Sequence, residues 1–452
     1  MKYSIITFGC RVNQADSLEV EEQLLAAGGQ PSPAECADVV VINTCSVTAT
    51  SDQGARQTIR RIARHNPGAR IVVTGCYATR DPSQVSNLPG VVGVISNREK
   101  HQVAPAVLWH AHEACGKSAI ELTTAERFGA GDGACGARIE PGAAGRTAFT
   151  LRIQTGCDEP CAYCIIPTTR GSGRSRPVDE VSKEVSRILG AGFKEIALTG
   201  VHLGSYGRDL PDAVDLTELL RRLDTQFRDV RFRISSLEPM DCAPAIVELV
   251  RRSDRFAAHF HLPLQHASDI VLQAMRRPYT LDDYRRLVDD IRDRIPHAAI
   301  GSDIIVGFPG ETESDVERLL RYLADSPLTY LHVFPYSDRP GTPAAMLSEK
   351  VPGAIVRERA ARVRSIGSML STRFKQRQVG AVHRGLTIED GSVAVTGNYF
   401  KVRIPPGVKR NQWVDVRVTG AGEAMTGELV IAHCFPFAPQ VSAPATSAIL
   451  PQ

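Results

Sequence analysis

Three cysteines stand close together in the segment Gly156-Cys157-Asp-Glu-Pro-Cys161-Ala-Tyr163-Cys164. Thiolates are the usual ligands of iron–sulfur clusters, and a four-iron cluster takes four ligands. Since no fourth cysteine is near in the sequence, three ligands would leave one iron open to bind a substrate. Zinc is the alternative, with His202 as a possible fourth ligand, but zinc sites favour CxxC pairs. The spacing of three and then two residues therefore favours an iron–sulfur cluster.

The order of strand and helix patterns indicates an α/β fold with two or three domains, as expected for 452 residues. In residues 1–114, short apolar runs alternate with helical patterns, which predicts a parallel sheet covered by helices. We expect strands at Tyr3–Phe8, Asp38–Asn43, Arg70–Gly75 and Val91–Ile95, and helices at Asp16–Ala27 and Ser51–His65. Residues 115–146 are rich in Gly and Ala, and we expect them to form a linker.

A second alternating region, residues 147–378, is expected to form an open, partial barrel of six βα units. Its strands are expected at Phe149–Gln154, Glu195–Thr199, Val230–Ser235, His259–Leu262, Ala299–Ile305 and Tyr330–Phe334. The cysteine segment follows the first of these strands, at the end where such barrels place their active sites. A long helix rich in arginine, Val356–Arg377, is expected to end this domain.

Residues 379–437 differ in character, because Gly, Asn and Pro turns separate strand-like alternations such as Trp413-Val-Asp-Val-Arg-Val. This pattern predicts a small antiparallel β-barrel. The segment Gly397-Asn-Tyr399-Phe-Lys401-Val-Arg403 places aromatic and basic side chains on one strand. That combination suits stacking on RNA bases and contact with the RNA backbone. Residues 438–452, rich in Pro, Ser and Ala, are expected to be disordered.

Composition adds limits on partners and location. The formal net charge of +3 is too small to indicate a nucleic-acid partner, so an RNA-binding surface would have to be a local basic patch. The eleven cysteines cannot all pair in internal disulfides, because their number is odd. We find no signal-peptide pattern and no apolar stretch long enough for a transmembrane helix. We therefore expect a cytoplasmic protein without membrane contact, in which the cysteines stay reduced.

Three further cysteines, Cys10, Cys45 and Cys76, each follow the end of a predicted strand in the N-terminal region. The carboxyl ends of parallel strands share one edge of a sheet. We therefore expect these thiols to converge and to hold a second, auxiliary cluster. The remaining cysteines fall outside both sets and are expected to be core or linker residues: Cys36, Cys115, Cys135, Cys242 and Cys434.

The CxxxCxxC spacing, with an aromatic residue before the last cysteine, resembles the radical S-adenosylmethionine superfamily. The resemblance implies a [4Fe-4S] cluster on Cys157, Cys161 and Cys164, with S-adenosylmethionine at its open iron as the source of a 5′-deoxyadenosyl radical. The contexts of the N-terminal cysteines extend the resemblance to the methylthiotransferase family, over nearly the whole chain. This implies an auxiliary [4Fe-4S] cluster, a C-terminal TRAM domain, transfer RNA as substrate, and a reductant such as flavodoxin or ferredoxin.

Within that family, the chain looks most like the enzymes that add a methylthio group to C2 of N6-threonylcarbamoyladenosine beside the anticodon. The stretches Phe8-Gly-Cys-Arg-Val-Asn-Gln-Ala-Asp, Pro263-Leu-Gln-His-Ala-Ser and His332-Val-Phe-Pro-Tyr-Ser-Asp-Arg-Pro-Gly-Thr carry this likeness. The isopentenyladenosine enzymes, and those that modify an aspartate of a ribosomal protein, are the alternatives within the family. An iron–sulfur electron carrier with an RNA-binding tail and a zinc-stabilised RNA-binding protein are alternatives from other classes.

Polar residues near the strand ends complete the predicted site. By resemblance to the family's cofactor-contact segments, we assign S-adenosylmethionine binding to Tyr163, Gly200, Ser235, Glu238, Gln265 and Asp303. We assign RNA contacts to two arginines that follow the cysteine segment and to the aromatic and basic strand residues: Arg170, Arg174, Tyr399, Lys401 and Arg403. Beyond the cluster ligands, the sequence identifies no catalytic residue.

Overall fold

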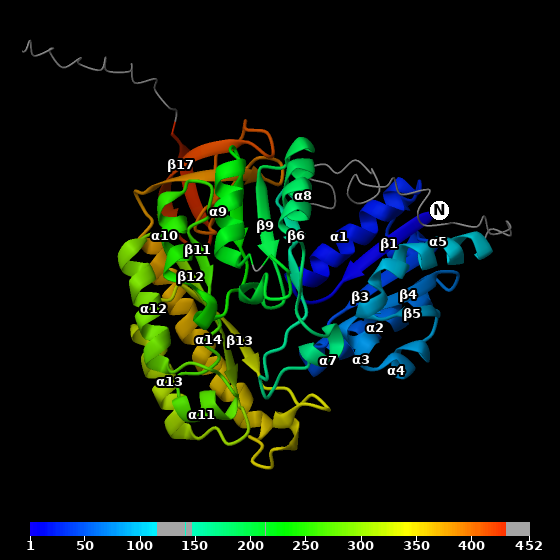
Figure 1. The fold of residues 1–452 in the computed structure, drawn as a ribbon, viewed down its shortest axis with the longest axis horizontal. Helices are drawn as coiled ribbons and strands as arrows, with labels where there is room; N and C mark the ends of the chain where they lie inside the picture. The colour runs from blue at the N-terminus through cyan, green and yellow to red at the C-terminus, as the bar shows by residue number, and fades with distance from the viewer. Residues whose placement is uncertain (115–140, 142–146, 213, 431–452) are drawn as a thin grey trace, which may run out of the picture.

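The computed structural model describes residues 1–114, 141, 147–212 and 214–430, which form three parts (Figure 1). An N-terminal sheet domain, blue to cyan in the figure, packs beside a larger half-barrel, and a small C-terminal barrel lies at one end of the half-barrel. This arrangement confirms the predicted fold class. The expected linker, apart from Pro141, and the expected disordered tail lie outside the described residues. No helix in the described ranges is both long and apolar enough to cross a membrane.

The N-terminal domain is a parallel sheet of five strands in the order β2-β1-β3-β4-β5. Its central strand β3 is buried at every position, as expected where helices cover both faces of a sheet. The four predicted strands are present, but the two-residue edge strand β2 was not predicted, and α1 begins at Arg11 and not at Asp16. The elements are β1 (Lys2–Thr7), α1 (Arg11–Ala26), β2 (Gln30–Pro31), η1 (Ala34–Cys36), β3 (Val39–Thr44), α2 (Ala49–His65), β4 (Arg70–Gly75), α3 (Cys76–Arg80), α4 (Pro82–Ser86), β5 (Val91–Ile95), η2 (Asn97–Gln102) and α5 (Val103–Ala114).

Six strands form the half-barrel, in two parallel three-stranded sheets ordered β10-β9-β6 and β11-β12-β13. Single parallel bridges join Phe232 to Phe256 and Ser236 to His261 between the two sheets. The six predicted strands are all present. Their bounds are β6 (Phe149–Arg152), β9 (Glu195–Thr199), β10 (Arg231–Ile234), β11 (His259–His261), β12 (Ala299–Val306) and β13 (Tyr330–Pro335). A short hairpin that the sequence analysis missed, β7 (Gln154–Thr155) and β8 (Arg174–Ser175), flanks the cysteine segment.

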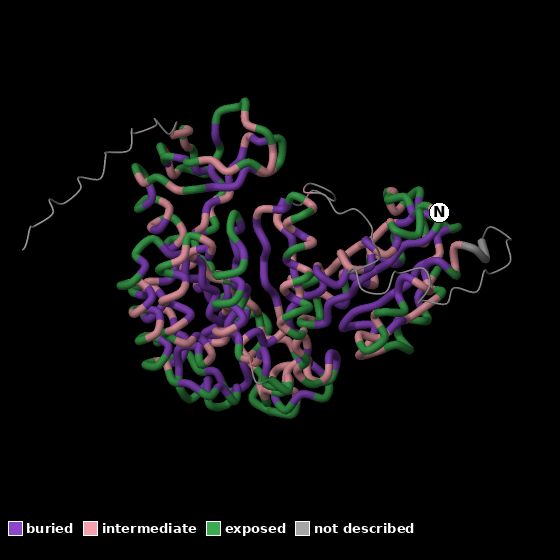
Figure 2. Tube along the Cα trace, turned by 45° about the horizontal axis from the view of Figure 1, so that its top comes forward, coloured by how far each residue is buried: buried purple, intermediate pink, exposed green. Residues whose placement is uncertain are grey.

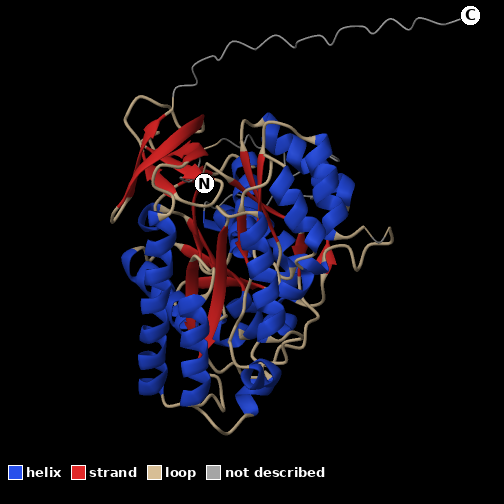
Figure 3. Cartoon of the chain, turned by 90° about the vertical axis from the view of Figure 1, so that its left-hand side faces the viewer, coloured by secondary structure: helices blue, strands red, loops and turns tan. Residues whose placement is uncertain are grey.

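Helices cover the outside of the half-barrel (Figure 3), and buried stretches of chain run through its interior (Figure 2). Apolar side chains of its strands and helices form one core. Each long helix buries one face; α8, for example, buries Val181, Val185 and Ile188 at helical spacing. Capping boxes begin α12 and α13, in which Thr280 and Thr312 accept a bond from the third helical residue. The helices are α7 (Ile166–Arg170), α8 (Val178–Gly190), η5 (Leu203–Ser205), α9 (Leu216–Gln226), η6 (Pro239–Asp241), α10 (Pro244–Arg252), α11 (Asp269–Ala274), α12 (Leu281–Arg294), α13 (Glu313–Asp325), η7 (Pro343–Met346) and α14 (Gly353–Gln376).

The C-terminal domain is a closed five-stranded barrel in the order β14-β15-β16-β18-β17. Its strands are β14 (Val382–Ile388), β15 (Val393–Thr396), β16 (Lys401–Arg403), β17 (Trp413–Ala421) and β18 (Met425–Leu429). Four strand pairs are antiparallel, as predicted, but β16 and β18 pair in parallel and close the barrel.

A buried ion-pair cluster joins this barrel to the half-barrel. Glu195 accepts bonds from Arg231 at 2.8 Å and from Arg233 at 3.1 Å. Both arginines also donate to main-chain carbonyls of β14, β15 and the turn that follows β15. Burial alone would raise the pKa of Glu195, but the two guanidinium groups outweigh it and lower the pKa to about 2. The C-terminal barrel is therefore fixed to the start of β9 and β10, at the end opposite the cysteine segment.

Candidate active site

The cysteine segment forms a loop that folds back on itself directly after the hairpin strand β7. Gly156 has a φ of +75°, and a side chain there would collide with the carbonyl of Ser172. The Cys157 amide donates to the Gly171 carbonyl at 3.0 Å, which closes the loop. The structure thus holds the three thiols at the carboxyl end of the first barrel strand, where the sequence analysis expected them.

The three thiols of this loop influence one another electrostatically, which shows that they converge. Burial raises the pKa of the Cys164 thiol to about 12, so a thiolate there requires a compensating positive charge. Arg277 donates to the Cys161 sulfur at 3.0 Å and forms an ion pair with Glu238. The donor set and its basic neighbour fit a cluster bound through three thiolates.

A single zinc ion fits the site less well. A zinc ion holds its ligands close together, with a Zn–S bond of about 2.3 Å. In the part of the chain that the structure describes, the one group of such ligand atoms lying within 4.8 Å of one another is that of His261, Asp303 and His332. The three loop thiols do not form such a close group. His202, the possible fourth zinc ligand, has both ring nitrogens in hydrogen bonds, Nδ1 with the Cys157 sulfur at 3.7 Å and Nε2 with Asp241 at 2.6 Å.

The N-terminal cysteines also converge. Cys10 follows β1, Cys45 follows β3 and Cys76 follows β4, and these strands are neighbours in the sheet. Burial, with additional contributions from Cys10 and Cys76, raises the pKa of the Cys45 thiol to about 11. Asn97 donates to the Cys76 sulfur at 3.5 Å and to the main-chain carbonyl of Thr169 in the half-barrel at 3.0 Å. The second thiol set therefore lies on the side of its domain that faces the cysteine loop.

A cavity of about 180 Å³ lies between the cysteine loop and the segment that follows Cys45. Its wall includes Val47 and Thr48, which follow Cys45, and Cys164 of the loop. Three of the predicted cofactor residues line the same cavity: Tyr163, Gln265 and Asp303. A small molecule bound there would touch both domains.

The other three predicted cofactor residues do not line this cavity. Gly200 packs against Gln154, whose side-chain oxygen accepts bonds from the two amides after Gly200. Ser235 is buried, and its hydroxyl has no hydrogen-bond partner among the described residues. Glu238 reaches the cysteine loop through its ion pair with Arg277. Their assignment to cofactor binding stays a prediction.

The prediction that Arg170 contacts RNA is wrong. Its side chain is 3% exposed, and it binds Asp16 at 3.0 Å and Asn13 at 2.5 Å in the N-terminal domain. Its role is to join two domains. Arg339 does the same on the other side of the thiol sets, since it is buried and binds Asp52 at 2.7 Å. Asp52 also accepts a bond from Arg80.

The remaining predicted RNA residues are exposed. Arg174 lies on β8, and Lys401 and Arg403 lie on β16, where they line a cavity of about 770 Å³ with Tyr399. The Tyr399 ring is also a domain contact, because Arg11 of the N-terminal domain donates to its hydroxyl at 3.0 Å. Their contact with RNA stays a prediction.

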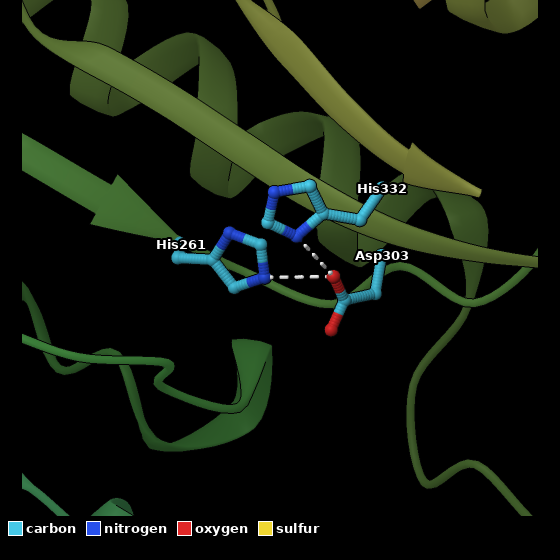
Figure 4. A group of neighbouring side chains, drawn as sticks. All are labelled: His261, Asp303 and His332. Carbon is cyan, nitrogen blue, oxygen red and sulfur yellow. Dashed lines mark hydrogen bonds and ion pairs between the residues drawn. The ribbon is translucent and has the colours of Figure 1, made fainter. Parts of the chain in front are cut away.

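The sequence analysis missed a hydrogen-bonded histidine cluster inside the half-barrel (Figure 4). Asp303 accepts bonds from His261 at 2.9 Å and from His332 at 3.2 Å. The Tyr330 hydroxyl lies 3.0 Å from the other nitrogen of His261 and 2.8 Å from His259. Burial would raise the pKa of Asp303, but the bonds from the two histidines outweigh it and lower the pKa to about 2. Because β11, β12 and β13 are adjacent, alternate residues on these strands meet inside the barrel. The polar residues at alternate positions of the predicted strands were therefore a signal from which this cluster could have been predicted.

Comparison with known proteins defines the class. The family model described as the Radical SAM superfamily matches residues 151–323, and that described as Uncharacterized protein family UPF0004 matches residues 2–96. With its half-barrel and three-cysteine loop, the protein is a radical S-adenosylmethionine enzyme. The threonylcarbamoyladenosine tRNA methylthiotransferase MtaB of Bacillus subtilis (strain 168) is 36% identical over 88% of this chain and 88% of its own. The chain therefore belongs to the methylthiotransferase family.

Two further relatives support the family and the fold. The tRNA-2-methylthio-N(6)-dimethylallyladenosine synthase of Paenarthrobacter aurescens (strain TC1) is 33% identical, over 84% of this chain and 73% of its own. The solved structure of the radical S-adenosylmethionine methyltransferase TsrM from Kitasatospora setae superposes with a TM-score of 0.54. It covers 76% of this chain and 77% of its own at 14% identity, and so supports the fold alone.

Proposed function

We propose that this protein adds a methylthio group to C2 of N6-threonylcarbamoyladenosine, next to the anticodon of transfer RNA. The observation that carries the proposal is a cavity of about 180 Å³ lined by Cys164 of the cysteine loop and by Val47 and Thr48, which follow Cys45 in the N-terminal domain. Two separate thiol sets are what a reaction needs when it generates a radical at one site and supplies sulfur at the other. The similarity to the Bacillus subtilis methylthiotransferase over most of both chains supports the same reaction and substrate.

The cofactors of the proposed reaction are two [4Fe-4S] clusters and S-adenosylmethionine. Cys157, Cys161 and Cys164 would hold the radical cluster, which, when bound with S-adenosylmethionine, supplies one-electron chemistry that removes a hydrogen atom from substrate. The N-terminal thiols Cys10 and Cys45, with Cys76, would hold the auxiliary cluster. Its support is the convergence of these thiols at one sheet edge.

The chain's own residues would then bind and orient the reactants. Tyr163, Gln265 and Asp303 would contact S-adenosylmethionine, because they share the cavity with Cys164. Arg277 would stabilise negative charge at Cys161, to which it donates. The exposed basic residues, Arg174, Lys401 and Arg403, would contact phosphates of the RNA. We also propose that the protein is cytoplasmic, where transfer RNA and a reductant such as flavodoxin or ferredoxin are available.

Nucleoside mass spectrometry of transfer RNA, from cells with and without the gene, tests the proposal. We expect the 2-methylthio derivative of threonylcarbamoyladenosine to disappear and its precursor to accumulate. Loss of the isopentenyl product would keep the chemistry and change the substrate. An unchanged nucleoside profile would contradict the proposal and favour an aspartate of a ribosomal protein as the substrate.

A further inference from the structure

An arginine without a carboxylate partner lies where all three domains meet. Arg11 is the residue after Cys10, and among the described residues no carboxylate lies within ion-pair distance of its guanidinium group. Its guanidinium group donates a hydrogen bond to the Tyr399 hydroxyl at 3.0 Å, and its guanidinium carbon lies 5.6 Å from the centre of that ring. A half-buried guanidinium held in this way retains most of its capacity to bind an anion.

The surroundings of Arg11 are polar and rich in hydrogen-bond donors. The Tyr399 ring also contacts His259, with ring centres 5.0 Å apart, and lies under Arg233, 4.6 Å from its guanidinium carbon. Burial, with further contributions from the charges of Arg233 and Arg11, lowers the pKa of His259 well below its usual range.

The carboxylates of Glu195 and Asp303 already have partners. Glu195 pairs with two arginines, and Asp303 accepts bonds from His261 and His332. Among the described residues, Arg11 is thus a guanidinium without a carboxylate partner of its own. A substituent that brings its own negative charge would match it, because guanidinium and carboxylate pair through two parallel bonds.

Arg11 lines neither of the two cavities itself, but it contacts Tyr399, which lines the larger one. Tyr330, His332 and Tyr399 line the cavity of about 770 Å³ beside the basic strand β16, and Asp303 lines the cavity of about 180 Å³ beside Cys164. His332 of the larger cavity and Asp303 of the smaller one are hydrogen-bonded at 3.2 Å, so the two cavities lie close together. A nucleoside whose ring reaches the thiols would have its N6 substituent near this pair of side chains.

We infer that Arg11 binds the carboxylate of the threonylcarbamoyl group and thereby determines which modified adenosine the enzyme accepts. The inference rests on the proposed function. An isopentenyl group at the same place would cover the guanidinium without offering it a partner, and unpaired buried charges are strongly disfavoured. Discrimination against substrates that lack the expected polar partner is the strongest kind an enzyme site achieves.

The test compares three anticodon stem-loop RNAs that differ in one adenosine. The first carries threonylcarbamoyladenosine, the second carries the same group with a primary amide in place of its carboxylate, and the third carries unmodified adenosine. Dissociation constants are measured with the reconstituted holoenzyme by fluorescence anisotropy. We expect wild-type enzyme to bind the carboxylate RNA about 10- to 100-fold more tightly than the amide RNA, as charge-assisted hydrogen bonds imply. Arg11→Gln should bind both RNAs equally, and Arg11→Lys should restore part of the preference. Arg60→Gln, an exposed arginine on α2, is the matched control.

Three results would overturn the inference. The first is equal binding of the carboxylate and amide RNAs by wild-type enzyme. This comparison does not use the variant, so it tests the inference even if Arg11→Gln fails to hold its iron. The second is an unchanged preference in Arg11→Gln with full iron content. The third is an equal loss of affinity for all three RNAs, which would assign Arg11 to a backbone phosphate. Formation of the methylthiolated product from the carboxylate RNA is measured separately. If wild-type enzyme forms no such product, the proposed function is rejected, whereas the binding measurements test the role of Arg11.

Discussion

Replacing Asp16 with Asn removes a buried negative charge from the contact between the N-terminal domain and the half-barrel. The side chain is 1% exposed and forms ion pairs with Lys100 of its own domain and with Arg152 and Arg170 of the half-barrel. Burial alone would raise the pKa of this carboxyl, but the three cations outweigh it and hold the pKa well below its usual range. Asp16 is therefore ionised at neutral pH and holds two domains together.

Removal of one member of a buried ion pair typically costs about 3–5 kcal/mol. We expect about 3 kcal/mol for Asp16→Asn, because the amide oxygen still accepts a hydrogen bond. The loss applies to the domain contact, so hydrogen–deuterium exchange at α1 and α7 is the appropriate measurement, with exchange about a hundredfold faster. Radical chemistry should continue in the half-barrel, so 5′-deoxyadenosine should still form while the methylthiolated product falls.

The matched control is Asp290→Asn, which breaks an exposed pair with Arg294 on one helix. Exposed pairs of this kind contribute about 0.3–0.5 kcal/mol, so neither exchange nor product ratio should change. Unaltered exchange at the domain contact in Asp16→Asn, together with an unaltered ratio of 5′-deoxyadenosine to product, would refute the idea that this carboxylate aligns the two thiol sets.

Three further predictions follow from the site and its supports. Cys157→Ala should abolish S-adenosylmethionine cleavage, whereas Cys10→Ala should spare some cleavage and stop sulfur insertion; intact methylthiolation in the second variant would contradict the auxiliary cluster. Gly156→Ala should lower iron content after reconstitution, because its positive φ costs about 1–2 kcal/mol and the side chain would collide with the loop. The pKa of Glu195 is about 2 when folded, below its ordinary value of 4.5, so its stabilisation is complete above about pH 4.5 and is lost as pH falls toward 2. Acid unfolding of Glu195→Gln should therefore be flatter than that of wild type across this range, and a parallel profile would contradict the buried ion pairs.

The sequence predicted the thiol sets well because a single rule places them. Cys45 and Cys76 each follow a strand of apolar residues, and Cys157 follows the first barrel strand. Parallel strands have their carboxyl ends at one edge, so the position along the chain already determines the position in space. No knowledge of distant partners was needed.

The arginines show where this approach fails. Arg170 and Arg174 lie four residues apart with similar neighbours, yet one is buried and the other exposed. The difference comes from Asp16, 154 residues before Arg170, whose carboxylate compensates the cost of burying the charge. A charged residue in a sequence is expected at the surface unless its partner is known. The spacing of apolar and polar residues along the chain does not reveal a partner in another domain.

The same argument applies to the domain boundaries. Arg11 belongs to the N-terminal domain, His259 to the half-barrel and Tyr399 to the C-terminal barrel, yet their side chains form one wall. Tyr399 has a φ of 69°, unusual for a residue with a side chain, and this conformation occurs where its ring meets the other two domains. Backbone strain at a domain contact is retained only where the surrounding packing enforces it, so the three domains must be assembled before this wall exists. Substrate choice, if it depends on this wall, is therefore a property of the assembled chain, and no domain expressed alone should discriminate between N6-modified adenosines.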